Sequence, residues 1–188
     1  YVLTTAEASS NLARFDGVHY GYQDKSAQGV EETYKKSRSV GFGPEVQRRI
    51  MTGTFVLSHG YYDAYYTKGQ KVRRVLQDKT REIFTYVDCI LMPTTPSTAF
   101  KIGEKSEDPI AMYLADVATI PVNLAGICGM SLPAGLADED NLPVGFQIMA
   151  PAMQDQRLYQ AGAALEAALL SKWGAPILSK APELKGAK

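Results

Sequence analysis

Metal-ligating and thiol side chains are scarce in this sequence, which holds two histidines and two cysteines among 188 residues. His59 and Asp63 alone have the spacing of metal ligands on a helix, and Gly60 between them weakens the helix that would hold them. Cys89 and Cys128 both stand among apolar neighbours. We therefore expect no metal site, and two reduced, buried thiols rather than a disulfide, as is typical of a cytoplasmic protein.

The sequence also lacks a long apolar run and an excess of either charge. Lys and Arg together number 20, as do Asp and Glu, so the formal net charge is zero. No stretch reaches the roughly 18 apolar residues of a membrane helix, and the first residues lack the basic-then-apolar pattern of a signal peptide. These absences argue against a membrane span, against secretion, and against nucleic-acid binding by the chain as a whole.

The remaining sequence alternates between helical and strand patterns, which predicts an α/β fold with a mixed β-sheet covered by α-helices. Helices are expected over 2–12, 27–39, 44–58, 61–86, 109–117 and 154–170, and strands over 88–92, 130–134 and 143–149. The first strand, DCILM, is apolar throughout, so we expect it to be buried on both faces. The other two flank the polar loop ADEDN and are predicted to form an antiparallel hairpin.

Two of these helices carry apolar stripes that we expect to face inward. The residues of the stripes are Tyr61, Tyr65, Val72, Leu76 and Ile83 in the first helix, and Leu158, Ala161, Leu165, Ala168 and Leu169 in the second.

Motifs for nucleophilic catalysis are incomplete. The run Gly129-Met130-Ser131 begins like a nucleophile elbow, but it lacks the closing glycine and leads into a strand, so we interpret Ser131 as a strand residue. No glycine-rich phosphate loop precedes Lys-Ser or Lys-Thr. The chain offers binding groups but no complete catalytic set.

Residues 108–135, DPIAMYLADVATIPVNLAGICGMSLPAG, organise the chain around Asp116, an acidic residue inside an apolar run that begins after Asp108. Its glycines, Gly126, Gly129 and Gly135, allow tight turns or a close approach of the backbone to a ligand. Asp116 either finds a cationic or hydrogen-bonding partner, or it is an N-cap or loop carboxylate that reaches water.

Arg49 is the cation best placed to meet such a carboxylate or a ligand. On the helix predicted over 44–58, Arg49 lies between Val46 and Gly53 on or beside the buried side, and Arg48 lies nearer solvent. The planar guanidinium of Arg49 could reach a carboxylate. The alternative is that its side chain runs along the edge of the core with the charge in water.

Three runs of the sequence resemble a known family: AEASSNLARFDGVHYGY, GFGPEVQRRIMTGTFVLSHGYYDAYYTKGQKVR and DPIAMYLADVATIPVNLAGICGMSLPAG. They are similar to the C-terminal part of the amidase signature family, and most of all to the glutaminase subunits of tRNA-dependent amidotransferases. The resemblance implies that residues 1–178 are the C-terminal portion of an amidase domain whose catalytic half is absent, with a frayed tail at 179–188. The opening of the chain at Tyr1, inside a helical pattern, agrees with this expectation.

The resemblance also implies a role for two charged residues. In the family, free glutamine is held by an arginine on the GFGPEVQRRI helix and by the acid of the DPxxMYxxD segment. These two residues correspond here to Arg49 and Asp116. The family hydrolyses glutamine with a Ser, cis-Ser, Lys triad whose serines lie in a glycine- and serine-rich signature. That signature and a matching lysine are missing from this sequence, so we expect this chain alone to be inactive.

The partners that the resemblance implies are two further subunits of the amidotransferase, known as B and C. The first of them, the amidating subunit, would use ATP and magnesium to convert Glu-tRNA(Gln) to Gln-tRNA(Gln) with the released ammonia. The tRNA would be reached only through this amidating subunit, and the other partner is a small third subunit. Two other interpretations stay open: a portion of a general amidase of the same fold, and a non-catalytic module that binds a partner subunit.

Overall fold

The computed structural model describes residues 1–104, 108–176 and 179. The chain divides into two compact units, Tyr1–Arg73 and Arg74–Lys188, and helix α4 (Lys68–Ile83) runs from the first into the second. Within the described residues, no helix is both long and apolar enough to cross a membrane.

The first unit is helical. It contains α1 (Val2–Asn11), a short 3₁₀ turn (Leu12–Arg14), α2 (Val30–Gly41), α3 (Pro44–Leu57) and a π-helical turn (Asp63–Thr67) that leads into α4. Pro44 occupies the first turn of α3, where proline needs no hydrogen-bond partner for its nitrogen. The helices predicted over 2–12, 44–58 and 27–39 are confirmed, the last shifted towards its C-terminal end.

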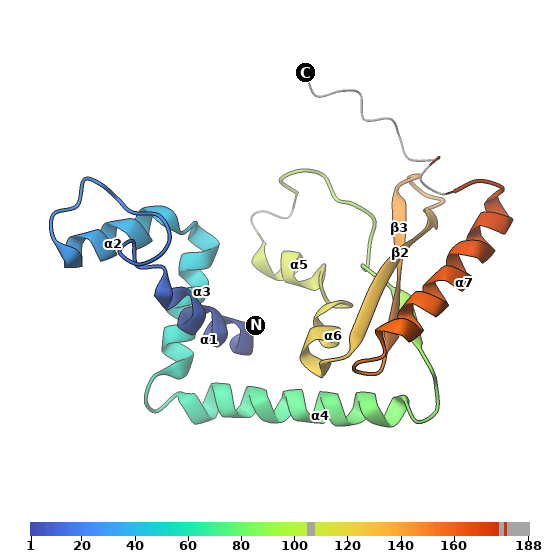
Figure 1. The fold of residues 1–188 in the computed structure, drawn as a ribbon, viewed down its shortest axis with the longest axis horizontal. Helices are drawn as coiled ribbons and strands as arrows, with labels where there is room; N and C mark the ends of the chain where they lie inside the picture. Colours follow the sequence, from blue (N-terminus) through green and yellow to red (C-terminus); the bar gives the residue numbers. More distant parts are fainter. Residues whose placement is uncertain (105–107, 177–178, 180–188) are drawn as a thin grey trace, which may run out of the picture. The chain divides into compact units, whose positions relative to one another are not determined.

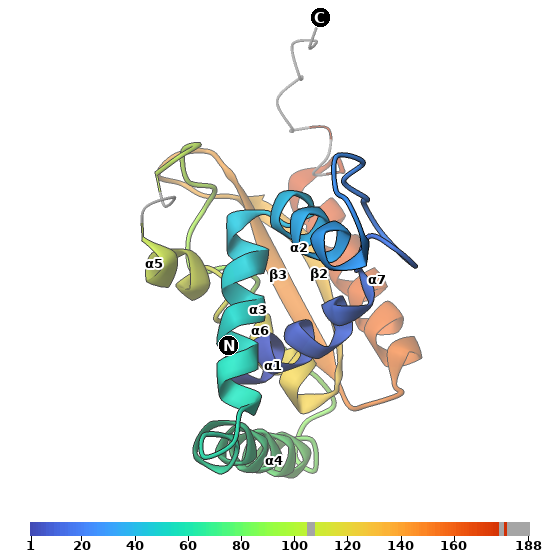
Figure 2. The ribbon, with the colours of Figure 1, turned by 90° about the vertical axis from the view of Figure 1, so that its left-hand side faces the viewer.

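A glycine allows α1 to pack closely on α3 (Figures 1 and 2). A Cβ atom at Gly53 would lie 2.0 Å from the backbone oxygen of Thr5 and 2.7 Å from Cβ of Ser9. Thr5, Ala6 and Val56 are buried around this contact. The two helix backbones therefore meet directly, and this contact forms the core of the first unit.

The second unit is built on a three-stranded antiparallel sheet with the order β1-β3-β2 in the described residues. The strands are β1 (Ile90–Pro93), β2 (Cys128–Leu136) and β3 (Pro143–Ala150), with a bulge in β2 between Pro133 and Gly135. The predicted hairpin of β2 and β3 is confirmed, because Met130 pairs with Ile148 and Leu132 with Phe146.

Helix α7 (Asp155–Trp173) packs against β2 and β3 on one face of the sheet (Figure 1). Ile148, Ala150 and Leu158 form the buried centre of this core. Half-buried side chains surround it, namely Cys89, Cys128, Met130, Leu132, Ala161 and Leu165. Ala168, which was predicted to face inward, is exposed, so the buried stripe of α7 is narrower than the sequence pattern suggested.

Two short helices, α5 (Pro109–Leu114) and α6 (Ile120–Ala125), precede β2. The sequence predicted a single helix over 109–117. Asp108 caps α5 by accepting hydrogen bonds from the backbone nitrogens of Ile110 (2.9 Å) and Ala111 (3.2 Å). Gly126 ends α6 with φ of 69°, in the left-handed region that glycine adopts at low cost.

Two further predictions about burial are wrong. Strand β1 lies at one edge of the described sheet and is covered on one face only, because the side chain of Leu91 is 55 % exposed. The apolar stripe of the helix predicted over 61–86 is largely exposed, with Tyr61, Tyr65, Val72 and Ile83 all open to solvent. The frayed tail predicted at 179–188 lies outside the described residues, except for Ser179.

Candidate functional site

Asp116 lies in the turn between α5 and α6, and its side chain is exposed. Its backbone oxygen accepts hydrogen bonds from the backbone nitrogens of Thr119 and Ile120, both at 3.1 Å. Within the described residues, no ion pair or hydrogen bond engages its carboxylate. The backbone is therefore held while the charge is open to solvent, as expected for a loop carboxylate, and this arrangement also suits a ligand contact.

The turn that contains Asp116 is hydrogen-bonded to the sheet through Ala118. Gln147 of β3 donates a hydrogen bond from Nε2 to the backbone oxygen of Ala118 at 3.0 Å, and both residues are buried. Helix α6, which follows the turn, packs closely on β2. A Cβ atom at Gly129 would lie 2.7 Å from Cγ1 of Val122. Gly129 thus permits the close approach that the sequence suggested, although here the approaching group is α6.

Arg49 extends from α3 in the first unit. Its Nε donates to Oε1 of Glu45 at 2.9 Å, and its guanidinium carbon lies 5.7 Å from the centroid of the Tyr1 ring. The side chain of Arg49 is 40 % exposed and that of Arg48 is 54 % exposed, so the face predicted for each arginine is confirmed. Oε2 of Glu45 also accepts a hydrogen bond from Nη1 of Arg48 at 2.7 Å, and one carboxylate therefore binds both arginines.

Ser131 lies in β2, as predicted. Its Oγ is 2.6 Å from Oγ1 of Thr94, and Gly145 of the central strand leaves room for the two hydroxyls to meet. A hydroxyl pair without a base is a weak nucleophile. This pair therefore fits a structural hydrogen bond better than a catalytic one.

The two thiols are free, as expected, but both are half-buried rather than buried, which corrects the predicted burial. Cys128 pairs with Ala150 of β3, and Cys89 precedes Ile90, whose partner is Met149 on the same strand. With β3 between them, the two cysteines are about two strand spacings, roughly 10 Å, apart. That separation is too large for a disulfide.

The histidines occupy exposed turns rather than a metal centre. Among the described residues, no cluster of three or more His, Cys, Asp or Glu side chains is arranged to hold a metal ion. His19 pairs with Asp16, with 2.8 Å between Nδ1 and Oδ2. That hydrogen bond, together with those from the backbone nitrogens of His19 and Val18, holds the pKa of Asp16 well below its usual range.

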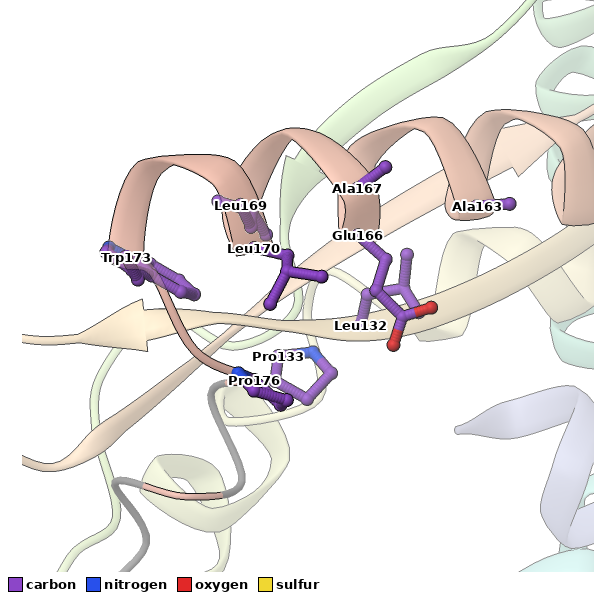
Figure 3. Close-up of a pocket in the computed structure, with 9 residues that line it drawn as sticks. All are labelled: Leu132, Pro133, Ala163, Glu166, Ala167, Leu169, Leu170, Trp173 and Pro176. Carbon is purple, nitrogen blue, oxygen red and sulfur yellow. The ribbon is translucent and has the colours of Figure 1, made fainter.

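The second unit also contains an open groove between the C-terminal half of α7 and β2 (Figure 3). Its volume is about 430 Å³. The lining is apolar apart from one carboxylate, and consists of Leu132, Pro133, Ala163, Glu166, Ala167, Leu169, Leu170, Trp173 and Pro176. Such a lining favours contact with apolar surface over binding of a zwitterion.

Comparison with known proteins decides the family. The model of the Amidase family matches residues 1–159, which is most of the chain and includes parts of both units. The chain belongs to the amidase family. Arg49, Asp116 and Gln147 of this amidase-family chain all lie inside the matched range.

Relatives within the amidase family are similar over nearly the whole chain. The A subunit of glutamyl-tRNA(Gln) amidotransferase from Streptomyces coelicolor is 58 % identical over 186 residues, covering 98 % of this chain and 37 % of that protein. The same-named protein of Mycobacterium tuberculosis is 55 % identical over 170 residues, covering 89 % and 34 %. The chain thus spans little more than a third of the length of these curated relatives.

Solved structures agree with this assignment. The crystal structure of the glutamyl-tRNA(Gln) amidotransferase A subunit from Thermotoga maritima is 40 % identical, with a TM-score of 0.53, over 87 % of this chain and 33 % of that one. A 6-aminohexanoate cyclic dimer hydrolase has a TM-score of 0.64 at 20 % identity, over 93 % and 35 %, and shows a shared fold alone. The predicted family and the α/β fold class of the amidase family are both confirmed.

Proposed function

We propose that this chain is the glutamine-binding portion of the glutaminase subunit of a tRNA-dependent amidotransferase. The observation that carries the proposal is the similarity to the A subunit of glutamyl-tRNA(Gln) amidotransferase at 58 % identity over 98 % of the chain. In this proposal, glutamine hydrolysis in the whole glutaminase subunit supplies the ammonia that converts Glu-tRNA(Gln) to Gln-tRNA(Gln).

Two charged residues carry glutamine recognition in this proposal. Free glutamine presents a carboxylate and an ammonium group, which call for a cation and an anion in the protein. The Arg49 guanidinium would bind the carboxylate, and the Asp116 carboxylate would bind the ammonium, each through charge-assisted hydrogen bonds. The exposure of Asp116 and the partial exposure of Arg49 support this role, because a small solute could reach both groups.

The chemistry itself is assigned elsewhere in the assembly. We expect the chain alone not to hydrolyse amides, because the Ser, cis-Ser, Lys triad of the family has no counterpart in this sequence. The amidating subunit would use ATP and magnesium and would bind the tRNA, with the small third subunit completing the assembly. The zero net charge of the chain supports an indirect contact with tRNA.

The test is calorimetric titration of the chain with L-glutamine and with two analogues that each lack one charge. The des-amino analogue, glutaramate, removes the partner of Asp116, and 4-aminobutanamide removes the partner of Arg49. We expect L-glutamine to bind more tightly than either analogue. Equal affinity for all three compounds would contradict recognition of a zwitterion and favour a general amidase, and no binding of any of them would contradict glutamine recognition by this chain alone.

A further inference from the structure

Gln147 is a polar side chain that the structure buries. It lies in β3 between the half-buried Phe146 and the core residue Ile148, and it points to the sheet face opposite that core, yet it is only 5 % exposed. A buried amide must satisfy its hydrogen bonds within the protein. Gln147 donates from Nε2 to the backbone oxygen of Ala118 at 3.0 Å.

The acceptor of this hydrogen bond belongs to the turn that carries Asp116. Ala118 follows Asp116 by two positions, and the next two backbone nitrogens, of Thr119 and Ile120, both donate to the Asp116 oxygen at 3.1 Å. The hydroxyl of Thr119 donates to the same oxygen at 3.2 Å. A restraint on Ala118 is therefore a restraint on the backbone of Asp116.

The contact of Val122 with Gly129 lies after the turn, in α6. It holds α6 against β2, and thus the residues that follow the turn, but it does not reach the turn itself. Among the described residues, the Gln147 side chain makes the direct polar link between the sheet and residues 115–119. Since the Asp116 side chain is exposed, its position depends on how firmly this backbone is held.

We propose that Gln147 is a positioning residue that holds Asp116 in place for the ammonium group of glutamine. This inference rests on the proposed function, because it takes Asp116 as a ligand of the substrate. When the link is lost, the turn is no longer restrained by the sheet, and its own hydrogen bonds, from the backbone nitrogens of Thr119 and Ile120 to the Asp116 oxygen, would open more often.

The experiment replaces Gln147 by Met, which keeps the length of the side chain and removes the amide. The matched control is Gln77→Met, because Gln77 also donates from Nε2 to a backbone oxygen, that of Leu124 at the opposite end of α6 (3.4 Å). Two readouts are taken on the chain: hydrogen exchange of the Thr119 and Ile120 amides, and calorimetric affinity for L-glutamine and glutaramate. Asp116→Asn is measured alongside.

We expect Gln147→Met to speed exchange of the two amides about tenfold and to weaken L-glutamine binding about tenfold. Glutaramate has no ammonium group, so its affinity should be unchanged. Gln77→Met should leave all readouts unchanged. The second variant, Gln147→Glu, can donate to Ala118 only when its carboxyl is protonated, and protection of the two amides relative to Gln147→Met should therefore return between about pH 8 and about pH 5.

The outcomes separate this inference from the proposed function. Unchanged exchange in Gln147→Met would overturn the positioning role whatever happens to glutamine. Equal losses for L-glutamine and glutaramate would overturn it as well, because the effect would then not run through the ammonium contact. If Asp116→Asn leaves glutamine affinity unchanged, the proposed role of Asp116 fails, and with it the role of Gln147 in binding.

Discussion

Glu45 and Arg49 lie one turn apart on α3 and form an ion pair, with 2.9 Å between Oε1 and Nε. Both side chains are about two-fifths exposed, so the pair contributes little to stability by itself. In the proposed site, the carboxylate of glutamine would meet an arginine already oriented by Glu45. Under this proposal, the main role of the pair would be to orient the Arg49 side chain.

The first prediction distinguishes the two neighbouring arginines. Arg49→Ala should weaken L-glutamine binding by about 2–5 kcal/mol, the cost of leaving a bound carboxylate without its charged partner. Arg48→Ala is the control, because Arg48 shares Glu45 but faces solvent, and it should cost less than about 1 kcal/mol. Calorimetric titration measures both. Equal losses in the two variants, or none in Arg49→Ala, would remove Arg49 from the site.

The second prediction concerns acid sensitivity. Hydrogen bonds from His19 and from the backbone lower the pKa of Asp16 in the folded chain. A carboxyl whose pKa is lower in the folded state stabilises that state above its unfolded pKa, about 3.9, and the contribution is lost as the pH falls through the folded pKa. Asp16→Asn should therefore make the stability depend less on pH in this acid range.

Urea unfolding between pH 6 and pH 2 would follow this loss, which begins near the unfolded pKa and continues towards the folded one. Asp138→Asn is the control, because Asp138 lies in the exposed turn between β2 and β3. If wild type and Asp16→Asn lose stability equally over this range, the Asp16 contacts do not govern acid sensitivity.

The third prediction tests the contact of α1 with α3. Gly53→Ala places a Cβ 2.0 Å from the backbone oxygen of Thr5, so the helices must separate. We expect a loss of about 2 kcal/mol or more in the free energy of unfolding, as for other overpacked cores. Gly43→Ala, at the start of the same helix, meets no atom within 4 Å and should cost much less. Similar midpoints for the two variants in chemical denaturation would contradict a direct contact of the backbones.

The fourth prediction concerns the groove between α7 and β2. Its apolar lining, next to the exposed edge of a strand, should bind a hydrophobic dye and favour self-association of the chain. Leu170→Lys places a charge in the groove and should lower dye fluorescence by roughly half. Met153→Lys is the control, since Met153 is exposed and does not line the groove. A clean monomer by light scattering, without dye binding, would contradict the prediction.

Much of the fold follows from local patterns of apolar and polar residues in the sequence. The β2–β3 hairpin was predictable because Val144, Phe146 and Ile148 alternate with smaller or polar residues across a polar loop. Helix α3 was predictable because Pro44 and Glu45 mark its start and apolar residues recur along one side. In both cases, the local pattern and the tertiary packing point to the same element.

The predictions of secondary structure and burial are wrong where tertiary contacts determine the structure. Helix α6 was missed because six residues give too little periodicity, and Pro121 in its first turn looked like the end of the preceding helix. The apolar run of β1 cannot show from sequence alone that Leu91 faces solvent at a sheet edge. The stripe of α4 follows the helical period, but in the described structure Val72 and Ile83 have no core to cover.

The candidate site was predicted in part. The side of α3 on which Arg49 lies follows from helical spacing, and the exposure of Asp116 matches one of the two interpretations of its surroundings. Its place in a binding site stays a prediction. Gln147 was missed because a polar residue that alternates with apolar ones in a strand usually marks the solvent face. Here the segment that contains Ala118 covers that face instead.

Because β3 is the central strand of the described sheet, its consecutive residues face different neighbours on the two sides of the sheet. Ile148 and Ala150 are constrained by the packing under α7, and Gln147 by the turn on the other side. Amino-acid substitutions at alternate positions of this strand should therefore have two different effects. Substitutions at Ile148 would mainly lower thermal stability, and substitutions at Gln147 would in addition loosen the Asp116 segment, because they leave the backbone oxygen of Ala118 without its hydrogen bond.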